Sequence, residues 1–215
     1  MAFITFEGQE GAGKSTQIKL LYDNLILRGY NVILTRDPGG TLISEKIRDI
    51  LTDLNNNAIA KETEALLYIA ARAQLVNEII APHLVSGGIV LCDRFVDSTI
   101  AYQGFGNKLD VDKLTSINIF VAKGLVPDIT FYLRIEPSEG IKRKSAYKEL
   151  DRIESKALHY HMAVKNGYDQ LSERFKERFV TIDAKISIED IHKTILEKTE
   201  TLIGQKKIIY KEDVL

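Results

Sequence analysis

Several features of secreted, membrane-spanning or metal-binding proteins are scarce in this sequence. Its single cysteine, Cys92, excludes an internal disulfide bond and fits a reducing compartment. No apolar run approaches the roughly 18 residues that cross a bilayer. The chain enters an apolar, strand-like segment directly after Met1, so we expect no signal peptide and a cytoplasmic protein. The four histidines show no spacing typical of metal ligands.

The sequence also lacks an excess of either positive or negative charge. The 215 residues include 29 basic and 30 acidic side chains, which gives a net charge of −1. This balance offers no electrostatic argument for a nucleic-acid or membrane partner, although a local basic cluster can still bind a small anion. Hydrophobic and charged fractions of 45% and 27% are typical of a soluble globular protein.

What is present is a glycine-rich segment, GQEGAGKS, at residues 8–15. It fits the phosphate-binding loop, G-x-x-x-x-G-K-[ST], between an apolar strand-like segment and a helix-like pattern. Its backbone N–H groups can surround an anion, and the helix N-terminus adds partial positive charge. Lys14 can reach the outer phosphates, and the Ser15 hydroxyl can bind Mg²⁺. The predicted ATP site consists of Gly8, Gln9, Glu10, Gly11, Ala12, Gly13, Lys14, Ser15 and Thr16.

Alternating strand and helix patterns predict a parallel sheet with helices on both faces. Strands are expected at residues 3–7, 32–35, 89–92, 129–133 and 179–183. Helices are expected at 13–28, 44–51, 63–84, 110–121 and up to about 175, with Ser138 and Ser187 as N-caps of two others. The sequence thus predicts a five-stranded P-loop NTPase fold, with one domain at 1–205 and a tail at 206–215.

Cationic and acidic side chains follow the predicted strands at the edge where parallel sheets bind ligands. Asp93 closes a central strand and is the expected partner in the Mg²⁺ shell. A charged stretch at residues 143–154 lacks an apolar stripe and is typical of a mobile lid. The cations expected in an acceptor pocket are Arg36, Arg48, Arg72 and Arg94.

A GTPase and an ATP-driven binding module are the alternatives to a small-molecule kinase. Residues 37–40 fit D-x-x-G, and residues 107–110 fit the guanine-reading pattern N-K-x-D. The guanine pattern must follow a buried strand, whereas residues 107–110 follow the segment YQGFG. A binding module needs a large partner surface, of which the sequence gives no sign. An acceptor pocket with a lid favours the kinase.

The sequence resembles the thymidylate kinase family. The resemblance rests on GQEGAGKST, TRDPGGT, LLYIAARAQL, DRFVDSTIAYQG and LDRIE, in this order and at these spacings. It covers the chain up to about residue 200, and the absence of arginine from the phosphate loop resembles the bacterial type. The resemblance implies an enzyme that converts ATP and dTMP into ADP and dTDP with Mg²⁺, in dTTP synthesis, and that forms a homodimer. Another nucleoside monophosphate kinase is the closest alternative.

The resemblance also implies roles for individual residues. Residues 183–185 would lie beside adenine, and Asp93 would act near the metal. The implied dTMP site consists of Glu10 at the sugar 3′-hydroxyl, Tyr68 stacked on thymine, Arg72, Thr99 and Gln103 at the base edge, Tyr102 against the sugar, and Arg36, Pro38, Arg48 and Arg94 around the acceptor phosphate.

The lid departs from the family pattern at Tyr147, where a catalytic arginine is expected. A tyrosine with a pKa near 10 is neutral at pH 7 and cannot neutralise a phosphoryl group. Another cation must therefore act, and Arg143 is the first candidate because it lies four residues earlier on the same helix face if the helix continues. Lys148 is the second, Arg94 is the remaining one, and Arg152 is expected to hold the lid through carboxylates.

Overall fold

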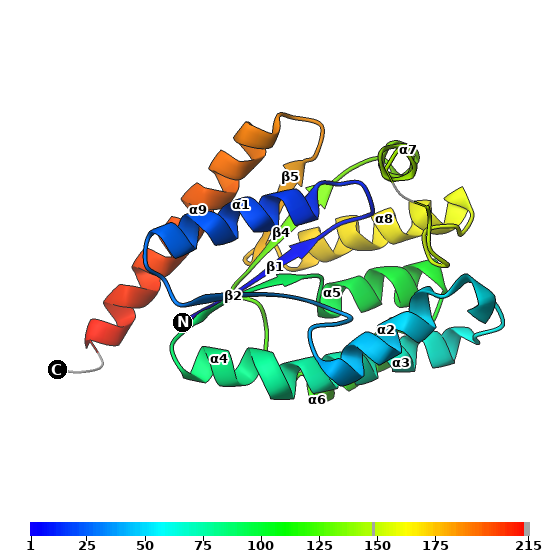
Figure 1. Cartoon of the computed structure of the whole chain (residues 1–215), viewed down its shortest axis with the longest axis horizontal. Coiled ribbons are helices and arrows are strands. Elements are labelled where there is room, and N and C mark those ends of the chain that lie inside the picture. The colour runs from blue at the N-terminus through cyan, green and yellow to red at the C-terminus, as the bar shows by residue number, and fades with distance from the viewer. Residues whose placement is uncertain (148, 213–215) are drawn as a thin grey trace.

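A five-stranded parallel sheet forms the centre of the protein (Figure 1). The computed structural model describes residues 1–147 and 149–212. The strand order is β2-β3-β1-β4-β5, and every neighbouring pair is parallel. This confirms the predicted sheet. The strands are β1 (Ala2–Glu7), β2 (Val32–Arg36), β3 (Ile89–Asp93), β4 (Ile129–Arg134) and β5 (Phe179–Asp183).

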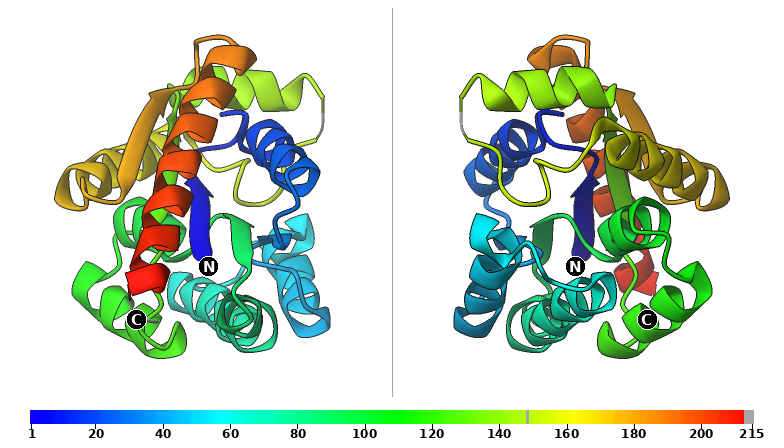
Figure 2. Two further views of the ribbon diagram at one scale, coloured as in Figure 1. Left: turned by 90° about the vertical axis from the view of Figure 1, so that its left-hand side faces the viewer. Right: turned by 90° about the vertical axis from the view of Figure 1, so that its right-hand side faces the viewer.

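Helices cover both faces of the sheet, as predicted (Figures 1 and 2). On one face α1 (Lys14–Leu27) packs against α9 (Ile188–Glu212). The helices of the other face and the two ends are α2 (Leu42–Thr52), α3 (Lys61–Leu75), α4 (Ala81–Val85), α5 (Val96–Thr99), α6 (Val111–Val121), α7 (Pro137–Ser145) and α8 (Leu158–Arg174). Short helical segments are η1 (Leu54–Asn56) and the π-helical η2 (Val76–Ile80) and η3 (Ile100–Gly106).

The central strand β1 is buried on both sides because its side chains alternate between the two faces. Ile4 packs in one core cluster with Leu21 of α1 and Ile195 of α9. Phe3 points the other way and packs in a second cluster with Leu75 of α3. The strand therefore fixes both helical layers, and its carboxyl end is held rigidly where the phosphate loop begins.

Two of the three predicted helix N-caps are confirmed, and one is wrong. Asp110 caps α6 by accepting from the amides of Asp112 and Lys113, at 3.0 Å each, as predicted. Ser187 also acts as predicted, since its hydroxyl accepts from the Asp190 amide at 3.0 Å. Ser138 is not a cap, because α7 begins one residue earlier with proline in its first turn.

One long helix matches its predicted range, and another extends further than predicted. The predicted helix over 63–84 is confirmed, since α3, the π-helical turn η2 and α4 follow one another without a break from Lys61 to Val85. Pro82 lies three residues before this helical run ends at Val85. The helix α9 continues past residue 205, and Lys206 contacts Asp128 at 2.6 Å. Among the described residues, no helix is long and apolar enough to span a membrane.

The carboxyl ends of all five strands meet at one edge of the sheet. The right-hand view of Figure 2 looks onto this edge, with α7 lying above it. The phosphate loop follows β1, the loop with Pro38 follows β2, and Arg94 follows β3. Parallel strand direction thus brings these three segments together, although they are far apart in the sequence.

Candidate active site

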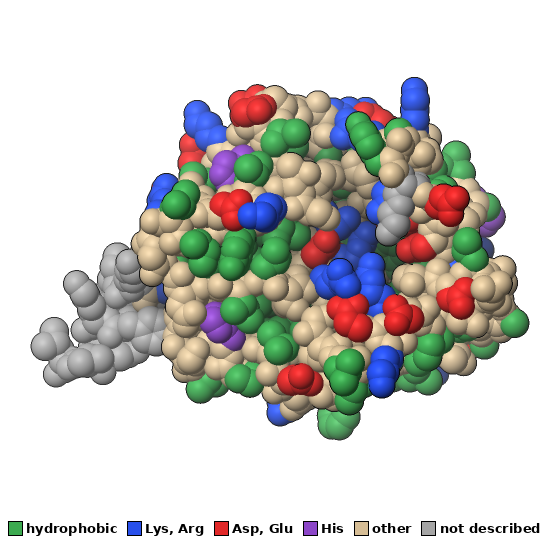
Figure 3. Space-filling model, in the orientation of Figure 1, with side chains coloured by type: hydrophobic (Ala, Val, Ile, Leu, Met, Phe, Trp, Pro, Cys, Tyr) green, Lys and Arg blue, Asp and Glu red, His purple; other side chains and the backbone are tan. Residues whose placement is uncertain are grey.

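An open cavity of about 820 Å³ lies at this edge of the sheet. Lys and Arg side chains gather in the hollow right of centre in Figure 3, with acidic side chains nearby. Gly8 and Gln9 are buried and do not line the cavity, and Lys148 lies outside the described residues. Predicted residues that line it are Glu10, Gly11, Ala12, Gly13, Lys14, Ser15, Thr16, Arg36, Pro38, Arg48, Tyr68, Arg72, Asp93, Arg94, Thr99, Tyr102, Gln103 and Arg143.

Lys14 is folded back over the phosphate loop. Its Nζ donates to the carbonyl oxygens of Gly8 and Gln9, at 2.8 and 2.9 Å. Burial, and then the nearby positive charge of Arg94, lowers the pKa of Lys14 to about 8. The side chain is therefore still mostly protonated at pH 7, and it lies where it can exchange these carbonyls for phosphate oxygens.

The phosphate loop and α7 touch through two glycines. Gly11 has a φ of +70°, and a Cβ there would lie 2.1 Å from the carbonyl oxygen of Gly140. A Cβ on Gly140 would lie 2.4 Å from the carbonyl oxygen of Glu10. Both positions therefore require glycine, and the helix that begins the predicted lid packs directly on the loop. The glycine inside the polar segment PSEGIKRKS was the signal that sequence analysis missed.

Arg94 is the centre of the polar network in the cavity. Its guanidinium donates to Glu10 Oε1 at 2.8 Å and to the hydroxyls of Tyr102 and Tyr168 at 3.1 Å each. A further hydrogen bond joins it to Ser98 Oγ at 3.2 Å. Arg94 has a φ of 71°, which is rare for a side chain of this size. Such backbone strain persists where the surroundings fix it, as these four partners do.

Glu7 accepts hydrogen bonds from Ser98 and Tyr168, two residues that contact Arg94. It was not among the predicted site residues. Its carboxylate is fully buried and accepts from the Phe95 amide at 2.8 Å, Ser98 Oγ at 2.6 Å and the Tyr168 hydroxyl at 2.8 Å. Burial first, and then the charge of Asp97, raises the pKa of Glu7 to about 7. An acidic residue that ends a buried strand directly before the phosphate loop was the available signal.

The pKa of Glu10 is shifted in the opposite direction from that of Glu7. Burial would raise its pKa, but the charges of Arg94 and Lys14 hold it below the ordinary value. The Tyr102 hydroxyl donates to both carboxylate oxygens, at 2.8 and 3.0 Å. Glu10 is thus an ionised acceptor that faces the cavity, and it holds Tyr102 and Arg94 in fixed positions.

The guanidinium group of Arg72 forms most of its hydrogen bonds within the protein. It is 1% exposed and donates to Asp37 Oδ2 at 2.5 Å, to the Phe95 carbonyl at 3.0 Å and to Asn118 Oδ1. Its loss would consequently remove buried hydrogen bonds as well as any contact to a ligand. Gln103, which lines the same wall, donates its amide to Glu64 at 3.0 Å.

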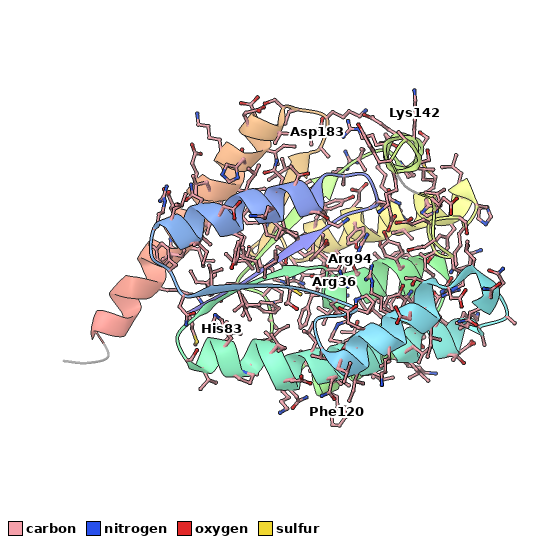
Figure 4. All side chains as sticks on the ribbon, in the orientation of Figure 1. Arg36, His83, Arg94, Phe120, Lys142 and Asp183 are labelled. Carbon is pink, nitrogen blue, oxygen red and sulfur yellow. The ribbon has the colours of Figure 1, made fainter. Side chains whose placement is uncertain are left out.

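Arg36 and Arg48 are two further predicted cations that line the cavity. Figure 4 shows Arg36 near Arg94. Arg36 pairs with Glu45 at 2.7 Å while half exposed, and Arg48 donates to the Pro38 carbonyl at 3.0 Å. These contacts orient the guanidinium groups and leave further donors free for an anion.

The predicted lid is partly helical and reaches the cavity with a cation. Arg143 lines the cavity, pairs with Glu139 at 2.5 Å and donates to the Ala184 carbonyl at 3.0 Å. The helix α7 ends at Ser145 and does not continue to Tyr147, so the condition for Arg143 and Tyr147 to share a helix face is not met. Tyr147 is 91% exposed. Lys144, which was not predicted, also lines the cavity and lies 3.3 Å from Glu154.

An apolar wall lies at the end of β5. Of residues 183–185, which are predicted to lie beside adenine, Ala184 lines the cavity while Asp183 and Lys185 do not. Ile186, Ile188 and Ile191 extend this wall and were missed, because isolated isoleucines before a helix carry no motif. Such a surface suits a flat heteroaromatic ring.

The donor set for a metal is limited but suitable for Mg²⁺. Asp93 Oδ1 is buried without a hydrogen-bond partner among the described residues, and Ser15 lines the same cavity. Carboxylate and hydroxyl oxygens suit Mg²⁺, which often uses one or two protein ligands together with substrate phosphates. Within residues 1–147 and 149–212, no group of three His, Cys, Asp or Glu side chains could form a dedicated metal site.

Comparisons with known proteins agree with this geometry. The family model for thymidylate kinase matches residues 6–195. The chain belongs to the thymidylate kinase family. A thymidylate kinase from Roseiflexus castenholzii is 48% identical over 215 residues, which cover 94% of each chain. One from Thermoanaerobacter sp. strain X514 is 46% identical over 195 residues, covering 91% of this chain and 95% of its own.

A solved thymidylate kinase structure supports the same family. The enzyme from Ehrlichia chaffeensis aligns with a TM-score of 0.75 at 33% identity, covering 93% of this chain and 98% of its own. As in that thymidylate kinase, the fold is of the P-loop NTPase type.

The GTPase alternative does not fit the thymidylate kinase geometry. Asn107 follows a π-helical turn rather than a strand, and its amide donates to Glu64 at 2.7 Å. Asp110 caps α6 instead of facing a guanine. The other GTPase-like residue, Asp37, is buried against Arg72. All three side chains thus form contacts within the protein.

Proposed function

We propose that the protein transfers the γ-phosphoryl group of ATP to dTMP, yielding ADP and dTDP. The observation that carries this proposal is that the phosphate loop and the cationic network around Arg94 line one cavity. A donor bound through Lys14 and an acceptor bound near Arg94 would therefore share one cavity. Membership of the thymidylate kinase family supports the same reaction.

The catalytic task is to bring two anions together. In phosphoryl transfer the protein acts mainly through positioning and electrostatic stabilisation, without a strong base. Backbone N–H groups of the loop and Lys14 would bind the ATP phosphates. Arg94, Arg36 and Arg48 would surround the acceptor phosphate, and the apolar wall at Ile188 would face adenine.

The remaining walls suit a deoxynucleoside. Tyr68 would stack on thymine, and Thr99, Gln103 and Arg72 would face the base edge, since all of them line the cavity. Tyr102 would lie against the sugar, held by its hydrogen bonds to Glu10. The cytoplasmic location that the sequence predicts stays a prediction.

Mg²⁺ is the proposed cofactor, with Ser15 and Asp93 as the residues that would hold it. The unpartnered Asp93 Oδ1 supports this choice. When bound, Mg²⁺ would neutralise charge on the phosphates. Lys14 and the loop amides would orient the same phosphates from the other side.

A homodimer is the proposed assembly. Large apolar side chains are exposed on α2, α3 and α6, namely Leu42 (74%), Ile43 (51%), Leu66 (55%), Ile119 (58%) and Phe120 (80%). Figure 4 shows Phe120 pointing away from the molecule. Helices α2 and α3, and α3 and α6, pack against each other, so these residues belong to neighbouring helices.

Light scattering at micromolar concentration should give the mass of two chains, and Phe120→Asp should shift it toward one chain. A wild-type protein that elutes as a single chain would refute the dimer. Its kinase activity would then have to be explained by one chain alone.

Substrate choice tests the proposed function directly. In a coupled ADP-release assay with a panel of nucleoside monophosphates, dTMP should be preferred over dUMP by roughly 10–200-fold in kcat/KM. One methyl group in an apolar pocket contributes about 1–3 kcal/mol. If AMP, CMP or GMP is used better than dTMP, the proposed function is wrong.

Arg143 should supply the cation that Tyr147 cannot. Arg143→Ala is expected to lower kcat by at least about tenfold with little change in KM, because the charge acts mainly in the transition state. The matched control is Lys142→Ala, since Lys142 is exposed and points away from the cavity (Figure 4). Near-normal kcat in Arg143→Ala, Lys148→Ala and their double mutant would exclude the lid as the cation source.

A further inference from the structure

Glu64 of α3 is a buried carboxylate that no motif of the sequence predicts. It is 2% exposed. Its Oε1 accepts from the Gln103 amide at 3.0 Å and from the Asn107 amide at 2.7 Å. Its Oε2 lies 2.8 Å from Arg152 NH1 and 3.3 Å from Lys156 Nζ. This carboxylate therefore joins one wall of the cavity to residues 152–156, at the end of the predicted lid.

The charge of Glu64 fixes the orientation of Gln103. Burial would raise the pKa of Glu64, but the hydrogen bond from Gln103, the charge of Lys156 and the hydrogen bond from Arg152 hold it below the ordinary value. An ionised carboxylate only accepts hydrogen bonds, so Gln103 must present its amide nitrogen to it. The Gln103 oxygen is then available to the cavity that Gln103 lines.

The two basic partners of Glu64, Arg152 and Lys156, lie at the end of the predicted lid. Arg152 is 5% exposed, and its Nε donates to the Leu51 carbonyl at 2.8 Å. Its pairing with Glu64 confirms the prediction that Arg152 holds the lid through a carboxylate. Lys156 also donates to Asn107 Oδ1 at 3.1 Å and lies 4.3 Å from the centre of the Tyr160 ring.

The same segment lines the cavity. Asp151, Ile153 and Glu154 are among its lining residues, and they lie next to Arg152 in the chain. The carboxylate of Glu64 thus contributes both to the docking of residues 151–156 and to the orientation of Gln103.

We propose that Glu64 is a positioning residue that directs the Gln103 oxygen at the acceptor base and couples this orientation to the docking of residues 151–156. The proposal rests on the proposed function. An oxygen at this place accepts from a base that carries a ring N–H, as thymine does at N3. Cytosine has an unprotonated N3, so two acceptors would face each other and the buried oxygen would stay unpaired. Glu64 would in this way select thymine over cytosine without touching either base.

Glu64→Gln tests this role with almost no change in volume. The new amide can donate to Gln103 or accept from it, so the orientation of Gln103 is no longer fixed. We expect kcat/KM for dTMP to fall at least about fivefold, mainly through KM, and the preference for dTMP over dCMP to fall similarly. The KM for ATP should change less than about twofold. The matched control is Glu62→Gln, which removes the same charge from an exposed position of α3.

A double mutant separates positioning from a general structural effect. Because Glu64 acts through Gln103, Gln103→Ala and the double mutant with Glu64→Gln should show the same preference between dTMP and dCMP. A preference that is unchanged in Glu64→Gln, or losses that multiply in the double mutant, would overturn the proposal. A wild-type enzyme that fails to phosphorylate dTMP would instead overturn the proposed function.

Lys156→Met tests the coupling even if Glu64→Gln does not fold. The Lys156 side chain is 23% exposed, and its loss leaves the contact between Glu64 and Gln103 in place. The KM for dTMP should rise about two- to fivefold while the preference for dTMP over dCMP is retained. An unchanged KM for dTMP would show that residues 151–156 are not coupled to the base.

Discussion

The ion pair between Arg94 and Glu10 is the contact on which the arrangement of the cavity depends. Glu10 belongs to the phosphate loop, and Arg94 follows the neighbouring strand, so the pair joins the two halves of the site at 2.8 Å. Ser98 and Tyr168 connect the same guanidinium to Glu7 below the loop. Because a partly buried cation is stabilised by pairing and hydrogen bonding, these contacts hold Arg94 in place.

The same arrangement leaves the cavity ready for anions. Lys14 and Arg94 lie close enough that the second cation helps to lower the pKa of the first. Phosphate groups placed between them would relieve this repulsion, since opposite charges stabilise both protonated forms. Two nucleotides that each carry phosphates can therefore be stabilised by cations that already lie close together in the cavity. The contact between Gly11 and Gly140 brings the lid helix to the same place.

Local signals in the sequence predicted much of the fold and of the cavity lining. The glycines of the phosphate loop and the start of the following helix form one continuous sequence motif. Asp110 caps α6 through the amides of Asp112 and Lys113, which are close to it in the sequence. The helix ends were less predictable, since α7 stops at Ser145 and thereby separates Arg143 from Tyr147. That outcome depends on packing, which helix periodicity does not report.

Long-range partners were not readable from the sequence. Glu64 meets Arg152 across 88 positions of the chain, and Tyr168 meets Glu7 across 161. Neither glutamate belongs to a spacing pattern, and each is buried only because distant cations or hydroxyls compensate for its desolvation. A single sequence shows which charges exist, but the fold decides which of them are brought together.

The most direct test of this account is calorimetric titration of dTMP and of a non-hydrolysable ATP analogue into wild type and Arg94→Met. Arg94 should bind the acceptor phosphate, so the affinity for dTMP should fall at least about tenfold, which corresponds to one lost charge-assisted contact. The affinity for the ATP analogue should fall less than about threefold, because Lys14 and the loop amides remain. Equal losses for both nucleotides, or an unchanged affinity for dTMP, would contradict the central role given to Arg94.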